Sequence, residues 1–363
     1  MGLLRELRPP DGLRVKRHRV AVIAGDGIGP EVIAAALGPM EHTAARGGFA
    51  LDVEHLPYGA AHYLATGETL PDAAFRHLRD DVDAIFAGAF GDPRVPGNEH
   101  ARDILLGLRQ RLDLYVNFRP VRLLHEDLGA LRLPGRAIDF VIFRENTEGV
   151  YLGRGRVADG EYVAEDVNSV RGVERILRAA FTWAQTHGRT LVTMSDKANA
   201  IPAHRVWGEQ FQRVAAEYRG IRAEHRYVDA LALELVREPE RFEVIVTNNL
   251  FGDILSDLGA GLVGGLGLAA SANLHPGRPG LFEPVHGSAP ALAGTGVANP
   301  MAAILAGALM FDELGHPDAA RALERAVETT LAAGVRTPDI GGGATTHDVA
   351  EAVAGAVSAR TAP

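Results

Sequence analysis

The feature that most constrains the fold of this chain is a regular alternation between short apolar runs and longer helical patterns. The runs are rich in β-branched and aromatic residues and end at turn formers or charges, which is typical of buried strands. They cover residues 19–25, 82–86, 140–143, 191–193 and 244–247. Amphipathic patterns at 173–185 and 205–218 predict helices between some of these runs. We therefore expect an α/β protein with a largely parallel sheet.

Size, charge and cysteine content narrow the class of protein. A length of 363 residues exceeds what one hydrophobic core usually serves, so two domains are expected. A net charge of −9, with both signs interspersed, argues against nucleic acid or a membrane surface as a partner. Cysteine is absent, which excludes disulfides and Cys-ligated metals and fits a cytoplasmic enzyme. No apolar run could span a bilayer, and residues 1–19 read as a short arm rather than a signal peptide.

A glycine cluster, GDGIGP at residues 25–30, follows the first strand and precedes a helical pattern. This is the usual setting of a phosphate-binding loop. However, Pro30 follows Gly29 at once, and no glycine lies three residues beyond Gly27, so the dinucleotide fingerprint is absent. The cluster predicts a tight structural turn, and it does not support a Rossmann fold.

Three arginines, Arg109, Arg119 and Arg144, each lie at or just beyond an apolar segment. A guanidinium group beside a buried segment needs an anionic partner, because an unpaired buried charge is costly. For any one of them, structural pairing with Asp or Glu is an equal alternative. Three such arginines together favour a site for a substrate with two carboxylates, which the planar guanidinium can grip in a bidentate manner.

Two aspartates, Asp253 and Asp257, are four residues apart in a helical pattern and therefore share one helix face. Like charges so placed are unfavourable unless a cation bridges them. Asp229 could supply a third ligand, and an all-oxygen set suits Mg2+ or Mn2+. The alternative is that Asp253 and Asp257 are solvated on an exposed helix. Lys197, just past a predicted strand, could join Tyr151 in acid–base chemistry, although a lysine there is usually a surface charge.

Taken in order, these segments resemble one family, the β-decarboxylating dehydrogenases that act on isopropylmalate, isocitrate, homoisocitrate and tartrate or D-malate. The similarity runs from about residue 20 to about residue 357 and is greatest to the isopropylmalate-oxidising members. The matching stretches are GDGIGPEV, LGLRQRLDLYVNFRP, FRENTEGVYLG, SDKANA, YVDA, FEVIVTNNLFGDILSDLGAGLVGGLGLAASANL, LFEPVHGSAP and GVANPMAAILAGALM.

The resemblance implies the two-domain fold of that family, with a cleft between the domains. Residues 1–114 and 265–363 would form a discontinuous cofactor-binding domain, and 115–264 the central dimerisation and substrate domain. The polar stretch at 154–167 would form an arm that joins the subunits of a homodimer. Lys197 and Asp229 would then reach into the active site of the partner subunit.

The resemblance also assigns roles to residues. Arg109, Arg119 and Arg144 would hold the malate carboxylates, and Asp253 and Asp257 with Asp229 of the partner subunit would hold the metal. Lys197, relayed by Asp229, would take the hydroxyl proton during hydride transfer, and Tyr151 would protonate the product enol. The cofactor would contact a set of residues on several segments: Ile28, Asn199, Glu283, His286, Gly287, Ser288, Ala289 and Asn299.

The chain departs from the family pattern at the cofactor site. NAD-using members carry an acid directly after the GSAP segment, and NADP-using isocitrate members carry Lys then Tyr. This chain has Ala291 and Leu292 there. No cationic group for a 2′-phosphate is evident, so we expect NAD, bound more loosely than usual.

The helix before Arg109 reads the substituent on C3 in this family. Leu105 and Leu106 match the apolar pair of the isopropylmalate enzymes, which favours 3-isopropylmalate. Arg102, one turn further back, stands where many of those enzymes have an acid. It is either solvated or grips a second anionic tail, such as that of homoisocitrate or a phosphonate. The run YVNFRP at 115–120 also resembles the tartrate/D-malate members, so a specialised paralogue remains an alternative.

Overall fold

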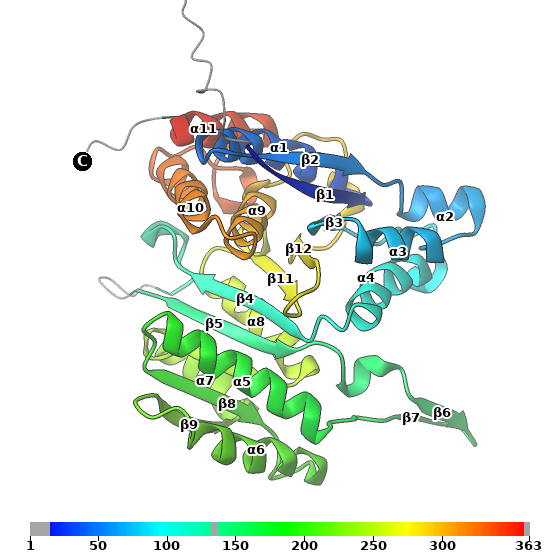
Figure 1. Ribbon diagram of the computed structural model, residues 1–363, viewed down its shortest axis with the longest axis vertical. Helices are drawn as coiled ribbons and strands as arrows, with labels where there is room; N and C mark the ends of the chain where they lie inside the picture. Colours follow the sequence, from blue (N-terminus) through cyan, green and yellow to red (C-terminus); the bar gives the residue numbers. More distant parts are fainter. Residues whose placement is uncertain (1–14, 132–136, 359–363) are drawn as a thin grey trace, which may run out of the picture.

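A single long sheet runs through the protein and organises everything else (Figure 1). The computed structural model describes residues 15–131 and 137–358, so most of the expected arm at 1–19 lies outside the described residues. In spatial order the ten strands of the sheet are β2 (Phe49–His55), β1 (Lys16–Gly25), β3 (Ala84–Ala89), β12 (Gly280–Pro284), β11 (Ala270–Leu274), β4 (Val116–Arg122), β5 (Asp139–Glu145), β10 (Val244–Thr247), β8 (Leu191–Asp196) and β9 (Arg222–Tyr227).

All five strands predicted from the apolar runs are present, and the expectation of a largely parallel sheet is confirmed, because six of its nine strand pairs are parallel. The pairs β2–β1, β1–β3 and β3–β12 are parallel, and so are β5–β10, β10–β8 and β8–β9. The three central pairs, β12–β11, β11–β4 and β4–β5, are antiparallel. Among these central strands β5 was predicted from its apolar run, whereas β4 and β11 alternate polar with apolar residues and β12 carries Glu283, so these three lacked the long apolar runs that reveal doubly buried strands.

Helices cover both faces of the sheet. At the part of the sheet that contains β1, β3 and β12, α1 (Gly29–Arg46) and α9 (Met301–Glu313) pack on one face. On the other face, α4 (Glu99–Arg111) contributes to a separate core. In the middle of the chain, α5 (Val170–Thr186) and α6 (Arg205–Ala215) cover one face, and α8 (Asn249–Leu262) covers the other. The remaining helices are α2 (Ala60–Thr66), α3 (Asp72–Asp80), α7 (Val228–Arg237), α10 (Pro317–Ala332) and α11 (Thr346–Ser358).

Short 3-10 segments connect several of these elements. They are η1 (Pro96–Asn98), η2 (Glu126–Leu128), η3 (Gly149–Leu152), η4 (Pro202–His204), η5 (Pro239–Arg241), η6 (Leu266–Leu268), η7 (Pro290–Leu292) and η8 (Pro338–Ile340). The predicted helix at 173–185 is confirmed as α5. The helix predicted at 205–218 ends three residues earlier, at Ala215.

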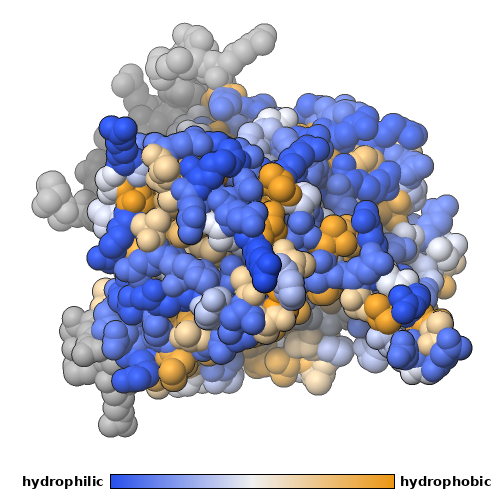
Figure 2. All heavy atoms as spheres, turned by 90° about the horizontal axis from the view of Figure 1, so that it is seen from below, coloured by the Kyte–Doolittle hydropathy of each residue, from blue (hydrophilic) through white to orange (hydrophobic). Residues whose placement is uncertain are grey.

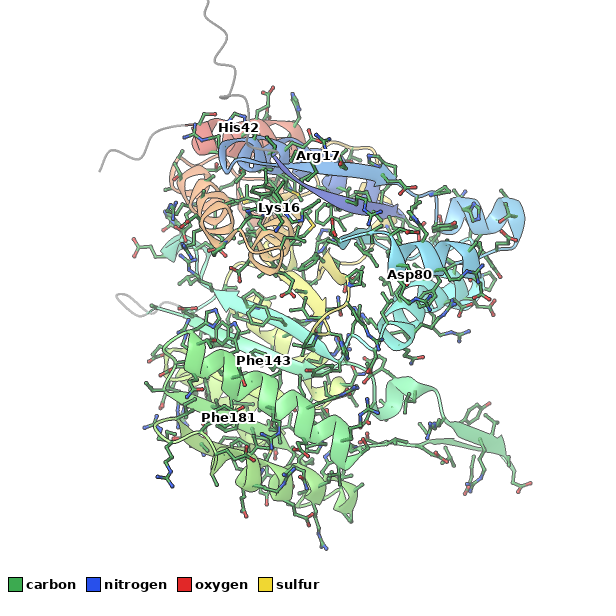
Figure 3. All side chains as sticks on the ribbon, viewed as in Figure 1. Lys16, Arg17, His42, Asp80, Phe143 and Phe181 are labelled. Atoms are coloured by element: carbon green, nitrogen blue, oxygen red, sulfur yellow. The ribbon has the colours of Figure 1, made fainter. Side chains whose placement is uncertain are left out.

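The buried core falls into clusters that follow this division. One cluster joins residues from β1 and α1 to residues from α9, α10 and α11, so the two ends of the chain share a core. Another packs α5 and α6 on β5, β8 and β10, and it includes Phe143 and Phe181, which lie in the lower half of Figure 3. The proposed domain boundaries at 114/115 and 264/265 stay a prediction.

The polar stretch at 154–167 contains a hairpin that extends from the body (Figure 1). Its strands, β6 (Gly155–Ala158) and β7 (Glu161–Ala164), pair only with each other, and every residue in them is exposed. Tyr162 has 85% of its surface exposed. Elsewhere, the face seen in Figure 2 is mostly hydrophilic, with scattered hydrophobic groups. Among the described residues, no helix combines the length and hydrophobicity needed to cross a membrane.

Candidate active site

Strand alternation places two of the predicted arginines on the same face of the sheet. In β4, Val116 and Phe118 face the α5 core, so Asn117 and Arg119 face the opposite side, toward α8. In β5, Phe143 likewise faces α5, so Arg144 faces α8. Asn117 and Arg144 are register partners across the two strands. The two guanidinium groups therefore emerge beneath the same helix.

Helix α8 approaches Arg144 very closely because residue 252 is glycine. A Cβ at Gly252 would lie 2.6 Å from both Cβ and Cγ of Arg144, well inside van der Waals contact. The helix begins at Asn248, whose side chain accepts a hydrogen bond from the backbone N–H of Phe251 at 2.9 Å. Because of this cap and Gly252, the first turns of α8 pack directly against Arg144.

Asp253 and Asp257 lie on the face of α8 that meets the arginines, as their spacing predicts. Arg144 donates a short hydrogen bond to Asp253 Oδ1 and a second bond, of 2.9 Å, to Asn249. Arg119 lies 3.6 Å from Asp253 and 3.5 Å from Asp257. The side chains of Arg119 and Arg144 are only 7% and 2% exposed, whereas those of Asp253 and Asp257 are 38% and 53% exposed. The cluster therefore opens to solvent on its carboxylate side.

The third arginine reaches the same region from another helix. Arg109, in the last turn of α4, donates to Glu283 Oε1 of β12 at 2.7 Å, and both side chains are buried. Burial lowers the pKa of Arg119, and repulsion by Arg109 lowers it further. Burial and then repulsion by Arg119 lower the pKa of Arg144 in the same way. The three cations lie close enough to repel one another, and Glu283, Asp253 and Asp257 pair with them.

The two aspartates differ in their protonation behaviour. Burial alone raises the pKa of Asp253, but the charges of Arg144 and Arg119 outweigh it, and the net pKa is lowered. Burial raises the pKa of Asp257, and the neighbouring Asp253 adds to the rise, which Arg119 only partly offsets. Two partly exposed carboxylates on one helix face are a hard-oxygen donor set, which fits Mg2+ or Mn2+. Among the described residues of one chain, no group of three His, Asp or Glu side chains could hold a metal.

Tyr151 belongs to the same cluster. It lies in η3, its hydroxyl donates to Asp253 Oδ2 at 2.8 Å, and the Arg144 guanidinium carbon is 5.4 Å from its ring centre. Burial raises the pKa of Tyr151, and so does the hydrogen bond to Asp253. The phenol therefore keeps its proton at neutral pH, as a general acid must before it reacts.

Lys197 and Asp229 form a separate pair. Lys197 follows β8, Asp229 lies in the first turn of α7, and Lys197 Nζ donates to Asp229 Oδ1 at 2.6 Å. This hydrogen bond lowers the pKa of Asp229. Strands β5, β10, β8 and β9 are parallel, so their carboxyl ends lie along the same edge of the sheet. Arg144 lies at this edge on β5, and the Lys197–Asp229 pair lies at it after β8 and β9. The structure records no contact between this pair and Asp253 or Asp257 in the described parts of the chain.

The expected C3-reading residues share one face of α4. Arg102, Leu105, Leu106 and Arg109 follow helical spacing, and Leu105 and Leu106 are partly exposed. The side chain of Arg102 is 64% exposed, and the charged partner recorded for it is its neighbour Asp103, at 3.6 Å. This contact is weak, so Arg102 remains free to be solvated or to bind a ligand.

Two of the predicted cofactor segments meet. The backbone N–H of Ile28 donates to the carbonyl of Ser288 at 2.8 Å, so the turn at 25–30 touches the 286–289 segment. At Gly27, φ is +56° and a Cβ would lie 2.0 Å from that same carbonyl, which confirms a tight turn that needs glycine. His286 is partly buried, burial lowers its pKa, and its Nε2 has no recorded hydrogen-bond partner. A turn at a helix N-terminus with an unsatisfied ring nitrogen nearby fits a dinucleotide cofactor.

The other predicted cofactor residues are dispersed. Gly287 and Ala289 flank Ser288, and Ala289 adopts a left-handed φ of +37°. Asn299 donates to Asp339 Oδ2 at 3.1 Å. Glu283 faces Arg109, and Asn199 is exposed in the loop that carries Lys197, away from the turn.

Sequence reasoning missed the polar residues that orient the arginines. Arg119 donates to Asn117 at 2.7 Å and to Ser256 at 2.6 Å. Asn273 accepts from Asn117 at 2.9 Å and donates to Glu283 at 2.8 Å, which links the two halves of the site. A usable signal existed, because Asn117 and Arg119 are two residues apart in a strand and therefore share a face. Asp339, beside Asn299, lay outside every motif considered.

Known proteins resemble this chain closely. The family model described as isocitrate/isopropylmalate dehydrogenase matches residues 19–353. A 3-isopropylmalate dehydrogenase of Thermobifida fusca is 44% identical over 322 residues, covering 86% of this chain and 91% of that protein. A decarboxylating D-malate dehydrogenase of Escherichia coli is 43% identical over 357 residues, covering 93% and 98%. An isocitrate dehydrogenase crystal structure from Methylococcus capsulatus matches with a TM-score of 0.85 and 39% identity, covering 94% and 99%.

The family match covers almost the whole chain, and the relatives at above 40% identity are themselves covered almost completely. Both kinds of relative are decarboxylating or isopropylmalate-oxidising dehydrogenases by name. The chain therefore belongs to the isocitrate/isopropylmalate dehydrogenase family and is a β-decarboxylating dehydrogenase, an oxidoreductase.

Proposed function

We propose that this enzyme oxidises a 3-substituted malate at its 2-hydroxyl and then releases the carboxylate on C3 as CO2. The proposed substrate is 3-isopropylmalate, which would yield 2-oxoisocaproate. The observation that carries the proposal is the cluster of buried Arg109, Arg119 and Arg144 facing the partly exposed Asp253 and Asp257. Such a cluster suits a dicarboxylate beside a divalent cation.

Substrate binding would exchange one set of ion pairs for another. In the structure, Asp253 pairs with the guanidinium groups of Arg144 and Arg119. Asp253 and Asp257, with Asp229 of a second copy, would hold the divalent metal, which would lower the pKa of the substrate hydroxyl and polarise the ketone formed from it. Engagement of Asp253 there would free both guanidinium groups for the substrate carboxylates, so binding of metal and dicarboxylate should be cooperative.

Proton transfers fall to two groups in this scheme. Lys197 of a second copy, relayed by Asp229, would accept the hydroxyl proton, and a bound nicotinamide cofactor would supply the acceptor for the hydride from C2. The bond from C3 to its carboxylate then breaks, CO2 departs, and the electron pair remains on the enol. Tyr151 donates its phenolic proton to C3, and its raised pKa keeps that proton available. We assign Lys197 and Asp229 to a second copy because in their own chain they pair with each other, apart from Asp253.

The family generally uses NAD(P) and a divalent metal, and it is typically dimeric. We propose NAD as the cofactor here, held by the 25–30 turn and the 286–289 segment. The exposed Ala291 and Leu292 offer neither the acid expected for NAD nor a cation for a 2′-phosphate. Steady-state rates with both dinucleotides test this assignment, and a clear preference for NADP would contradict it.

A second candidate substrate carries an additional anion. Arg102 is exposed on the Leu105–Arg109 face with only a weak partner, and this favours a charged tail such as that of homoisocitrate or a phosphonate-bearing malate. The D-malate relative, aligned over more of its length than the isopropylmalate relative, also keeps D-malate and tartrate open.

A substrate panel decides among these candidates. Initial rates are measured with 3-isopropylmalate, D-malate, tartrate, isocitrate, homoisocitrate and a phosphonate-bearing malate, each with Mg2+ or Mn2+ and both dinucleotides. The proposal expects the highest kcat/KM for 3-isopropylmalate. A higher value for any charged-tail substrate supports the second candidate, and no turnover of any 3-substituted malate contradicts the proposed function.

A further inference from the structure

Asp26 and His100 form a buried pair that the proposed chemistry does not use. Asp26 lies in the turn at 25–30, and His100 lies in the first turn of α4. Asp26 Oδ2 and His100 Nε2 are 2.7 Å apart, and their side chains are 4% and 0% exposed. A buried carboxylate is costly unless its lone pairs are satisfied, so its surroundings must compensate for its burial.

The carboxylate of Asp26 collects donors from three separate elements. Its Oδ1 accepts from the backbone N–H of Ala60 at 2.6 Å, where α2 begins. Its Oδ2 accepts from the backbone N–H of Gly91 at 2.8 Å and from His100. One side chain thus joins the 25–30 turn, the start of α2, the loop after β3, and α4.

The contacts of His100 fix its tautomer. Its Nε2 faces a carboxylate and must carry the hydrogen, because a carboxylate only accepts. Its Nδ1 is buried and has no recorded hydrogen-bond partner. The hydrogen on Nε2 therefore points to Asp26 Oδ2, and this bond fixes the orientation of the ring. The imidazole is fully buried, and the Tyr63 ring lies roughly parallel to it with 6.0 Å between the ring centres.

The two segments joined by this pair are the ones that face the two ligands. The 25–30 turn is bonded to the 286–289 segment through Ile28 and Ser288, on the cofactor side. Helix α4 carries Leu105, Leu106 and Arg109, on the substrate side. We propose that His100 and Asp26 are a positioning pair that holds the cofactor turn in register with the substrate helix. This inference rests on the proposed placement of the cofactor.

If this pair positions the cofactor turn, a substitution of His100 should weaken cofactor binding, although His100 lies on the helix that faces the substrate. The test is the dissociation constant for NADH in the absence of substrate, followed by the fluorescence of the dinucleotide. The glutamine amide nitrogen can reach the position of Nε2, whereas the asparagine nitrogen reaches only the position of Nδ1. His100→Asn should therefore raise the NADH dissociation constant about tenfold, and His100→Gln should stay within about twofold of the wild type.

The outcomes separate a positioning role from a purely structural one. Thermal unfolding of both variants shows that they are folded at the assay temperature, and His100→Leu replaces the Asn variant if that one does not fold. Equal NADH affinity in the wild type and the donor-deficient variant overturns the pairing proposal, and so does equal weakening in the Asn and Gln variants. A wild-type enzyme that turns over its substrate keeps the proposed function intact in both cases. A wild type that binds neither NADH nor NADPH overturns both.

Discussion

The proposed catalytic groups occupy two regions that differ in nearly every respect. The arginine–aspartate cluster under α8 is assembled within one chain, with Arg119 and Arg144 buried. The Lys197–Asp229 pair lies at the same sheet edge but is more exposed, and within residues 15–131 and 137–358 no hydrogen bond or ion pair joins it to the cluster. This difference supports our proposal that one chain builds the ligand-binding part of the site and that a second chain supplies the group that accepts the proton.

The largest expected effect comes from the exposed region. Lys197→Met should lower kcat by about 10³-fold or more, because a positioned acid–base group typically contributes 10²–10⁴. Initial rates, with size-exclusion chromatography to show that the assembly is intact, measure this. Turnover like that of the wild type would remove Lys197 from the mechanism.

Mixing two inactive variants tests directly whether the regions meet across chains. Lys197→Met retains Asp253, and Asp253→Asn retains Lys197, so a mixed dimer has one complete site if the site is shared. Activity should return when the two variants are refolded or co-expressed together, whereas each alone stays inactive. Failure to recover activity, with mixed dimers demonstrated by mass spectrometry, would mean that each chain works alone.

The next effect concerns the buried region. Arg144→Lys keeps the charge but loses the fork that contacts Asn249 and Asp253, so KM for the dicarboxylate should rise about tenfold to a hundredfold. The control is Arg122→Lys, since Arg122 pairs with Glu324 and Glu328 outside the cluster and the change should alter KM less than about twofold. Equal KM values in the two variants would show that Arg144 is only a structural ion-pair partner.

A smaller effect is expected at Arg102, where exposure and function are hardest to separate. Arg102→Leu should change kcat/KM for 3-isopropylmalate less than about threefold, because a solvated arginine contributes little. For a substrate with an anionic tail, the same change should lower kcat/KM about tenfold if Arg102 binds that tail. The ratio of the two kcat/KM values shows whether this exposed cation is a ligand group or only solvated.

The smallest expected effect is on the pH dependence of folding stability, and it involves two histidines that lie outside both regions. His18 and His316 lie 2.9 Å apart, and burial lowers the pKa of each, with Lys16 adding to the effect. Folded pKa values below the ordinary value of 6.5 mean that the unfolded chain binds these protons more tightly. The contribution of these two histidines to stability should be fully present above pH 6.5. As the pH decreases below 6.5, Tm should fall by a few degrees. His18→Phe should flatten that dependence, and an unchanged profile would contradict this reading.

Part of this structure was predictable from local sequence, and the limit has a physical cause. The β-branched runs revealed β1, β3, β5, β8 and β10, because a strand buried on both faces must be apolar throughout. The two strands at the ends of the sheet, β2 and β9, were not predicted, because they are only partly buried. Strands β4, β11 and β12 were not assigned to the sheet, because their alternate positions carry Asn117, Arg119, Asn273 and Glu283. The polar residues that obscured those strands are also the ones that build the site.

The site itself was predictable in composition but only partly in arrangement. The spacing of Asp253 and Asp257 fixed their shared helix face, and the arginines were recognisable from their apolar surroundings. Pairings such as Arg109 with Glu283, and the buried link between Asp26 and His100, join residues far apart in the sequence. Their juxtaposition depends on strand order, which local patterns do not encode.

The absence of a side chain at Gly252 sets the distance between helix α8 and Arg144. Asp253 and Asp257 lie on the same helix, so the separation of their Cα atoms cannot change without unwinding it. The gap between that helix and Arg144 is set instead by the hydrogen atom at Gly252, where a Cβ would come within 2.6 Å of the arginine stem. A residue with a Cβ at position 252 would move Asp253 and Asp257 away from the sheet together. The uncharged Gly252 therefore controls the distance between these carboxylates and the buried arginines.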